Sequence, residues 1–245
     1  MDRKVVLITG AAKGIGAAIA KKMASLNYNV VINYLTSEGR AQKLKQEIEE
    51  KYQVQVKLLQ GDIASEEMVK EMVNNTINEF HHIDCLVNNA ALCQDNYFQD
   101  KTGEEFSKVL NTNLVGTFLM SKYVGEEMLK QKRGRIINIS STNALDTNET
   151  YSMDYDASKA GVISLTHNFA SALAPYVLVN AIASGWVSTE AVLEMNPTYL
   201  EEEKKKCMLE RFARPEEIAN VVVFLASEEA SYINSSVIRV DGGLK

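Results

Sequence analysis

Residues 5–16 read VVLITGAAKGIG, and this stretch decides the fold. A β-branched apolar run ends at Thr9, glycines follow at positions 10, 14 and 16, and an amphipathic helical pattern begins there. Glycine permits a tight turn and close backbone approach, while the free N–H groups and dipole of a helix N-terminus favour a pyrophosphate. The G-x-x-x-G-x-G spacing is neither G-x-G-x-x-G nor a Walker A loop. A strand-to-helix turn without a ligand is the alternative, which the third glycine disfavours.

Short β-branched runs alternate with longer helical patterns along the whole chain, as in a parallel sheet with crossover helices. We therefore predict one α/β domain over residues 1–245, a doubly wound Rossmann fold with a seven-stranded parallel sheet and helices on both faces. The predicted strands are 5–9, 30–33, 54–59, 85–88, 135–139, 177–182 and 237–240. The predicted helices are 15–26, 37–51, 65–80, 103–130, 152–174 and 215–227.

Composition and charge exclude several classes of protein. Of the 245 residues, 46% are apolar, enough for a sizeable core. Three cysteines, at positions 85, 93 and 207, offer neither a disulfide framework nor a metal site, so we expect no metal and a reducing, cytoplasmic location. The net charge of −6 without a basic cluster argues against nucleic acid, and no run is long and apolar enough to predict a membrane span.

The end of the second predicted strand bears on the choice of nucleotide. In a dinucleotide fold an acidic residue there favours the ribose 2′-hydroxyl and repels a 2′-phosphate. Asn33, Tyr34 and Leu35 occupy this place, and Lys13 could face the phosphate, with Ser37 or Arg40 adding donors. The sequence thus favours NADP(H) over NAD(H). Two points weigh against NADP(H). The alternative for Lys13 is a solvated loop lysine without a ligand, and no arginine follows the strand directly.

Tyr155 and Lys159 lie one helical turn apart. A fixed ammonium stabilises a phenolate and lowers the tyrosine pKa towards the range useful for acid–base catalysis. Ser140 and Ser141 end the fifth predicted strand, at the carboxyl edge where open α/β sheets bind ligands. A hydroxyl there can hold a carbonyl oxygen.

Together these residues resemble the short-chain dehydrogenase/reductase family, over essentially the whole chain. The segment from Thr9 to Gly16 matches its T-G-x-x-x-G-x-G, and 88–91 resembles its N-N-A-G with alanine last. Asn113, Ser141, Tyr155 and Lys159 match its catalytic residues. The cofactor contacts that the resemblance implies are Gly10, Ala12, Lys13, Gly14, Ile15, Gly16, Asn33, Tyr34, Leu35, Asp62, Ile63, Asn89, Ala90, Ala91, Tyr155, Lys159, Gly185, Val187 and Thr189.

The resemblance implies hydride transfer between a nicotinamide and a carbonyl or alcohol carbon. Tyr155 would be the general acid, Lys159 would lower its pKa and hold the nicotinamide ribose, Ser141 would polarise the substrate oxygen, and Asn113 would fix a water. The nearest likeness within the family is to 3-oxoacyl-acyl-carrier-protein reductases and related carbonyl reductases. Two alternatives stay open: a dehydrogenase or reductase of another small alcohol, ketone or sugar, and a non-catalytic NADP-sensing protein.

Partners follow from the same resemblance. An acidic acyl carrier protein needs a basic patch beside the active site, and residues 130–135 supply candidates in Lys130, Lys132, Arg133 and Arg135. His167, Ser171 and Tyr176 stand where relatives that bind a carrier protein often have arginine, which weighs against that partner. The family's usual assembly implies a homotetramer. Residues 183–214 resist a strand–helix assignment and are the expected substrate lid, with apolar side chains that predict either a pocket for an apolar substrate or ordinary packing.

Overall fold

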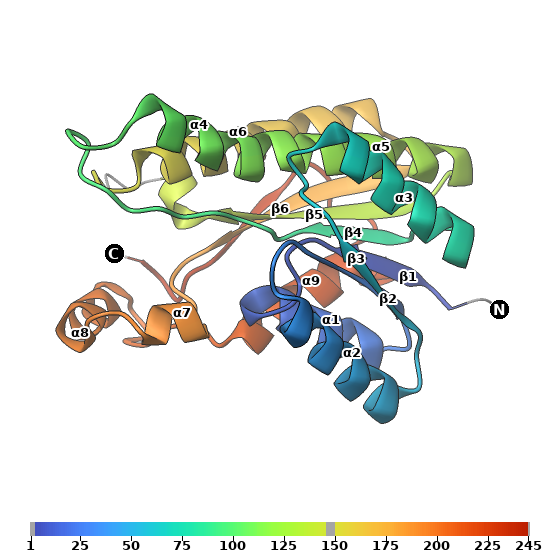
Figure 1. Cartoon of the computed structure of the whole chain (residues 1–245), viewed down its shortest axis with the longest axis horizontal. Helices are drawn as coiled ribbons and strands as arrows, with labels where there is room; N and C mark the ends of the chain where they lie inside the picture. The colour runs from blue at the N-terminus through green and yellow to red at the C-terminus, as the bar shows by residue number, and fades with distance from the viewer. Residues whose placement is uncertain (1–2, 146–149, 245) are drawn as a thin grey trace.

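A seven-stranded sheet in the order β3-β2-β1-β4-β5-β6-β7 runs through the molecule, and every strand pair is parallel (Figure 1). The structure is a computed structural model, which describes residues 3–145 and 150–244. The strands are β1 (Val5–Ile8), β2 (Asn29–Tyr34), β3 (Val56–Gln60), β4 (Cys85–Asn88), β5 (Gly134–Ser141), β6 (Val177–Ser184) and β7 (Val237–Val240). The predicted seven-stranded Rossmann sheet is confirmed.

Helices cover both faces of this sheet. They are α1 (Gly14–Ser25), α2 (Glu38–Tyr52), α3 (Glu66–Phe80), α4 (Gly103–Leu110), α5 (Gly116–Gln131), α6 (Met153–Ala172), α7 (Glu190–Leu193), α8 (Pro197–Lys206) and α9 (Pro215–Ala226). Figure 1 places α1, α2 and α9 on one face and α3, α5 and α6 on the other. Because both faces are covered, β1, β2 and β4 are buried along their whole length, which explains why their residues are mainly apolar.

Two predicted segments differ from the structure. The helix expected over 103–130 is interrupted by a π-helical turn at Asn111–Val115, between α4 and α5. The segment 183–214 is not irregular throughout, because β6 extends to Ser184 and α7 and α8 follow. Helix α8 begins with Asn196, whose side chain caps it, and with Pro197 at its first position, both recognised helix-start signals.

The sheet order changes direction between β1 and β4, since β2 and β3 lie on one side of β1 and β4 to β7 on the other. In open α/β sheets such a switch point leaves a crevice at the carboxyl ends of the strands. The glycine loop, segment 88–91 and Ser141 all follow strands that end there. Within residues 3–145 and 150–244, no helix combines the length and apolar character needed to cross a membrane.

Candidate active site

The glycine loop packs directly against the segment that follows β4. The Thr9 hydroxyl accepts hydrogen bonds from the backbone N–H groups of Asn89 (2.9 Å) and Ala90 (3.0 Å), and the Asn89 amide donates to the Thr9 and Gly10 carbonyls. Gly10 has a φ of +61°, and a Cβ there would lie 2.8 Å from the Ala90 Cα. A side chain is therefore excluded on conformational and steric grounds. Lys13 precedes α1 without a side-chain cap, so this helix start keeps free N–H groups for an anion.

Asn33 supports the loop from inside, which the sequence did not predict. Its side chain is buried, accepts a hydrogen bond from the Gly10 N–H (3.2 Å) and donates to the Gly61 carbonyl (3.0 Å). Arg40, considered above as a donor towards a 2′-phosphate, instead forms an exposed ion pair with Glu190 of α7. Such a pair contributes little stability, so Arg40 can exchange partners at low cost.

Tyr155, Lys159 and Ser141 meet at the carboxyl end of β5. The Ser141 side chain interacts with the Tyr155 phenol and favours its charged form, whereas the Ser140 hydroxyl donates to the Lys159 carbonyl (2.9 Å) and holds α6 against the strand. Lys159 is buried, its ammonium donates to the Ile139 carbonyl (2.7 Å), and its Nζ lies 5.5 Å from the centre of the Tyr155 ring. Of the two serines, Ser141 is therefore the one that faces the tyrosine.

Burial dominates the electrostatics of this group. It raises the pKa of Tyr155 above its ordinary value, the nearby Cys93 adds to the rise, and the Ser141 hydrogen bond opposes it. The Tyr-x-x-x-Lys spacing predicts a lowered Tyr155 pKa, but this structure shows the opposite. Burial destabilises the phenolate more than the neighbouring groups stabilise it. A protonated phenol is nevertheless the form that a general acid requires. Burial also lowers the pKa of Lys159 to about 8.

Replacing Lys159 by methionine is expected to stabilise the folded protein. The folded-state pKa of about 8 lies below the ordinary value of 10.5, so the unfolded chain binds the proton more tightly. The buried ammonium therefore lowers the free energy of unfolding. This loss is complete below pH 8 and disappears as the pH rises towards 10.5. We expect Lys159→Met to raise the unfolding free energy by roughly 3 kcal/mol at pH 7. Urea unfolding at pH 7 measures this gain, and a less stable variant would contradict it.

Asn113 lies in the π-helical turn, and its side chain is fully engaged. Its Oδ1 accepts from the Leu92 N–H (2.7 Å), and its Nδ2 donates to the Leu92 carbonyl (2.9 Å) and to the Ser158 hydroxyl (3.0 Å). Ser158 in turn donates to the Tyr155 carbonyl (2.6 Å). Asn113 thus ties the loop after β4 to the helix that carries the tyrosine.

A buried ion pair makes a second tie between the same two segments. Lys101 Nζ lies 2.7 Å from Asp154 Oδ2 and also donates to the Gln94 carbonyl (2.6 Å), and the two side chains are 6% and 0% exposed. Asp154 immediately precedes the tyrosine, and its Oδ1 accepts the Tyr155 backbone N–H (2.9 Å). The sequence analysis missed this pair, because no local spacing connects two residues 53 positions apart.

The remaining predicted contacts lie around the same crevice. Thr189 packs against the glycine loop, since a Cβ on Gly14 would lie 3.4 Å from its methyl group. The chain around Val187 pairs with Ala213, and Gly185 packs closely on Asp241. The Asp62 carboxylate accepts the Ala64 N–H (2.9 Å), next to the buried Ile63. Tyr34 is buried, whereas Leu35 is 54% exposed at the edge of the crevice.

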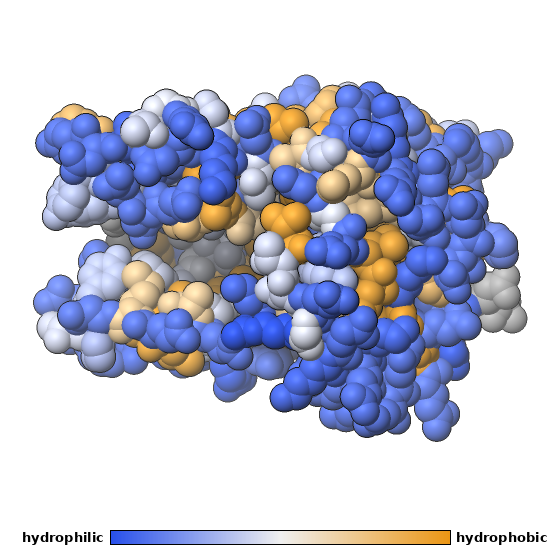
Figure 2. Space-filling view, in the orientation of Figure 1, coloured by the Kyte–Doolittle hydropathy of each residue, from blue (hydrophilic) through white to orange (hydrophobic). Residues whose placement is uncertain are grey.

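Apolar side chains border the entrance. Figure 2 shows the molecule hollowed between the part that carries α4 and the part that carries α7 and α8, with hydrophobic residues on the facing walls. Phe98, Met153, Leu193 and Met208 are all at least 45% exposed, and Phe98 and Met153 line a cavity of about 190 Å³. The exposed lid residues Leu193 and Met208 are compatible with a pocket for an apolar substrate, one of the two alternatives from the sequence.

The basic residues expected beside the active site lie elsewhere. Arg133 and Arg135 stand at the start of β5, at the opposite end of the sheet from Ser141. Arg133 pairs with Asp84 (3.2 Å), and Lys130, at the end of α5, pairs with Glu127 (2.5 Å). The prediction that this group lines the active-site mouth for a carrier protein is therefore wrong, because a parallel sheet sends the beginnings and ends of its strands to opposite edges.

A family described as Enoyl-(Acyl carrier protein) reductase matches residues 10–245. A mutant short-chain dehydrogenase/reductase of Serratia marcescens superposes with a TM-score of 0.93 at 29% identity, covering 99% of this chain and 98% of that one. The chain belongs to the short-chain dehydrogenase/reductase family. As a member of this family it is an oxidoreductase that acts on carbonyl or alcohol groups.

Curated relatives in the family carry a more specific name. The 3-oxoacyl-[acyl-carrier-protein] reductase FabG of Aquifex aeolicus is 40% identical over 245 residues, which cover 100% of this chain and 98% of the relative. The reductase of the same name from Staphylococcus epidermidis is 37% identical, with 98% of each chain covered. The structure of 3-oxoacyl-[acyl-carrier protein] reductase from Brucella melitensis superposes with a TM-score of 0.93 at 28% identity. The match covers 99% of this chain and 91% of that one.

Proposed function

We propose that this short-chain dehydrogenase/reductase is an NADP(H)-dependent enzyme that reduces a 3-oxoacyl thioester. The observation that carries the proposal is the meeting of Ser141, Tyr155 and the buried Lys159, whose Nζ is fixed on the Ile139 carbonyl (2.7 Å) and lies 5.5 Å from the centre of the Tyr155 ring. Two neighbouring hydroxyls suit a carbonyl oxygen, which accepts two hydrogen bonds and gains negative charge as it is reduced. The names of the curated relatives and the apolar entrance support a 3-oxoacyl substrate.

The residues of the crevice fit a nicotinamide dinucleotide. Gly10 and the free N–H groups at the start of α1 would hold the pyrophosphate, and Thr189 and Val187 would contact the nicotinamide amide. Lys13 is exposed beside the helix start and would meet a 2′-phosphate. The bound cofactor supplies a hydride to the substrate carbon.

The chain's own residues complete the reaction. Ser141 and Tyr155 orient the carbonyl oxygen, and the Tyr155 hydroxyl donates its proton to that oxygen as the alcohol forms. The Lys159 ammonium, fixed by the Ile139 carbonyl, stabilises the tyrosinate that remains until a water returns the proton. Asn113 acts as a positioning residue, because its side chain already holds Leu92 and Ser158. Residues 183–214 cover the substrate.

An assay with matched thioesters tests the proposal. NADPH oxidation is measured with a 3-oxoacyl thioester, with the trans-2-enoyl thioester of equal chain length, and with a panel of small ketones and sugars. We expect the 3-oxoacyl thioester to be reduced fastest. Faster turnover of the enoyl thioester would shift the assignment to the reaction named in the family description, and a small ketone or sugar as the best substrate would support the alternative from the sequence.

Replacing Lys13 by methionine tests the cofactor assignment. Loss of one charged donor to the 2′-phosphate is expected to lower kcat/KM for NADPH about tenfold. The value for NADH, which has no such phosphate, should change less than twofold. Equal losses for the two cofactors would remove Lys13 from the phosphate contact, and NADH as the better cofactor of the unmodified enzyme would overturn the NADP(H) assignment.

The same proposal includes the setting in which the enzyme works. We propose a cytoplasmic homotetramer acting on substrate carried by an acyl carrier protein, as the names of the relatives indicate for their substrates. Comparing kcat/KM for one 3-oxoacyl group on acyl carrier protein and on coenzyme A tests the carrier, and a higher value on coenzyme A would contradict it. Light scattering measures the number of subunits.

A further inference from the structure

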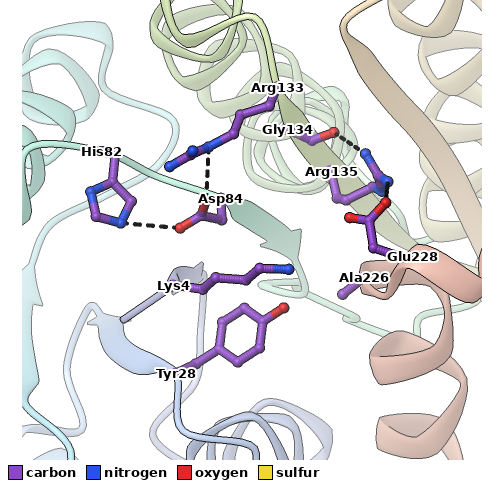
Figure 3. A pocket seen from close by; sticks show the side chains of 9 residues that line it. All are labelled: Lys4, Tyr28, His82, Asp84, Arg133, Gly134, Arg135, Ala226 and Glu228. Carbon is purple, nitrogen blue, oxygen red and sulfur yellow. Dashed lines mark hydrogen bonds and ion pairs between the residues drawn. The ribbon is translucent and has the colours of Figure 1, made fainter. Parts of the chain in front are cut away.

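A second cavity lies at the opposite edge of the sheet from the active site. It is open to solvent on one side, has a volume of about 490 Å³ and is bordered by residues at or just before the starts of four strands: Lys4, Tyr28, Asp84 and Arg135. Figure 3 shows these side chains arranged around a common space. The volume falls within the range of cavities that hold small organic molecules. Nothing in the proposed reaction uses it.

Three hydrogen-bond donors around this cavity lack an acceptor in the part of the chain that the structure describes. The Arg135 Nε is buried without a partner, although NH1 of the same guanidinium donates to the Gly134 carbonyl (3.2 Å). The Lys4 ammonium has no carboxylate partner and lies 6.0 Å from the centre of the Tyr28 ring. The Tyr28 hydroxyl has no acceptor, and in Figure 3 it points towards the same space as the Lys4 ammonium. Of the three, only the Arg135 Nε is fully buried, since Lys4 is exposed and Tyr28 half-buried. An unsatisfied buried donor is rare and calls for an acceptor.

The two carboxylates on the rim do not fill this role. Asp84 already accepts the Val5 N–H (2.8 Å), pairs with Arg133 (3.2 Å) and lies 3.2 Å from His82 Nε2. Glu228 is 80% exposed and stays 3.6 Å from Arg135, beyond a strong hydrogen bond. The cavity is therefore lined by three cationic side chains, Lys4, Arg133 and Arg135, and by only two carboxylates. This local excess of positive charge stands out on a chain whose net charge is −6.

Burial, followed by the neighbouring Cys85 and Asp84, raises the pKa of Tyr28. Its hydroxyl therefore remains protonated at physiological pH and can only gain from an acceptor. The Tyr28 ring and Ala226 add an apolar wall to the polar donors. A guanidinium and an ammonium on one side and an aromatic ring on the other are suited to an anionic group attached to an organic body.

We propose that this cavity binds a small organic phosphate, with its phosphate group accepting hydrogen bonds from Arg135, Lys4 and Tyr28. Three donors carried by three different strand starts match the several acceptor oxygens of a phosphate better than the two of a carboxylate. An inorganic phosphate ion alone fills only part of the 490 Å³, so the remaining volume receives the organic part beside Tyr28. The site is separate from the nucleotide crevice, which lies at the other ends of the same strands.

Isothermal titration calorimetry on the full chain tests this site. The protein is first saturated with NADPH, so that the glycine loop is occupied, and is then titrated with phenyl phosphate, inorganic phosphate or benzoate. We expect phenyl phosphate to bind more tightly than either of the others. No binding of phenyl phosphate, or tighter binding of benzoate, would overturn the proposal.

Variants locate the binding. Lys4→Met and Tyr28→Phe each remove one donor and are expected to weaken phenyl phosphate binding about tenfold and severalfold, respectively. Lys22→Met, at an exposed lysine near the end of α1, serves as the matched control and should leave the affinity unchanged. Thermal unfolding confirms that each variant folds. Unchanged affinity in both cavity variants would place the ligand elsewhere, and turnover of a substrate in phosphate-free buffer should stay at the unmodified level throughout.

Discussion

Tyr155→Phe is expected to lower the turnover number about 10²–10⁴-fold while leaving the fold and NADPH affinity intact. The substitution removes only the hydroxyl that interacts with Ser141 and would protonate the substrate oxygen. The ring remains, so packing and the 5.5 Å contact with the Lys159 ammonium are retained. NADPH oxidation with the best thioester measures the effect, and fluorescence titration with NADPH measures the affinity.

Tyr232→Phe is the matched control for this variant. The Tyr232 side chain is fully exposed and is not among the predicted site residues. It should retain the unmodified rate. If Tyr155→Phe also retained a rate within a few fold of the unmodified enzyme, proton donation would have to come from another group. If it lost NADPH binding as severely as turnover, Tyr155 would act on the cofactor rather than on the substrate.

Lys101→Met is expected to cost about 3–5 kcal/mol of unfolding free energy, because it leaves the fully buried Asp154 carboxylate without its cation. The double variant Lys101→Met/Asp154→Asn removes both charges, and its amide oxygen can still accept the Tyr155 N–H. We therefore expect the double variant to recover most of the lost stability. Urea unfolding of the two single variants and the double variant gives the coupling energy directly.

The outcome that contradicts this prediction is additivity. If the losses of Lys101→Met and Asp154→Asn simply sum in the double variant, the two side chains do not act as a pair. Because the pair joins the loop after β4 to the start of α6, the single variants should also lower turnover at temperatures where they remain folded.

Much of the fold was visible in the sequence because it rests on local patterns. The bounds of β4 and β7 agree with the prediction to the residue, since each is a short, mainly β-branched or apolar segment between polar or turn residues. The break in the helix predicted over 103–130 was not visible, because it accompanies hydrogen bonds between Asn113 and Leu92, which lie 21 positions apart. The short helices α7 and α8 were missed although Asn196 and Pro197 mark the start of α8.

The candidate site shows the same limit. Position suggested Tyr155 and Lys159 on one helix and Ser140 or Ser141 at the expected edge of the sheet, and the family resemblance selected Ser141. The buried Lys101–Asp154 pair and the inward role of Asn33 depend on contacts between distant segments, which no spacing reveals. The misplacement of Arg133 and Arg135 has the same cause, because the end of the sheet that a residue occupies follows from topology.

Single-turnover hydride transfer tests the central claim most directly. The enzyme in excess is mixed with NADPH and a 3-oxoacyl thioester, and the decay of NADPH absorbance is followed in the unmodified protein and in Tyr155→Phe. We predict rapid decay in the unmodified protein and a rate at least about 10²-fold lower in the variant. Equal rates in the two proteins, or no decay with the unmodified protein, would contradict a reductase that works through Tyr155.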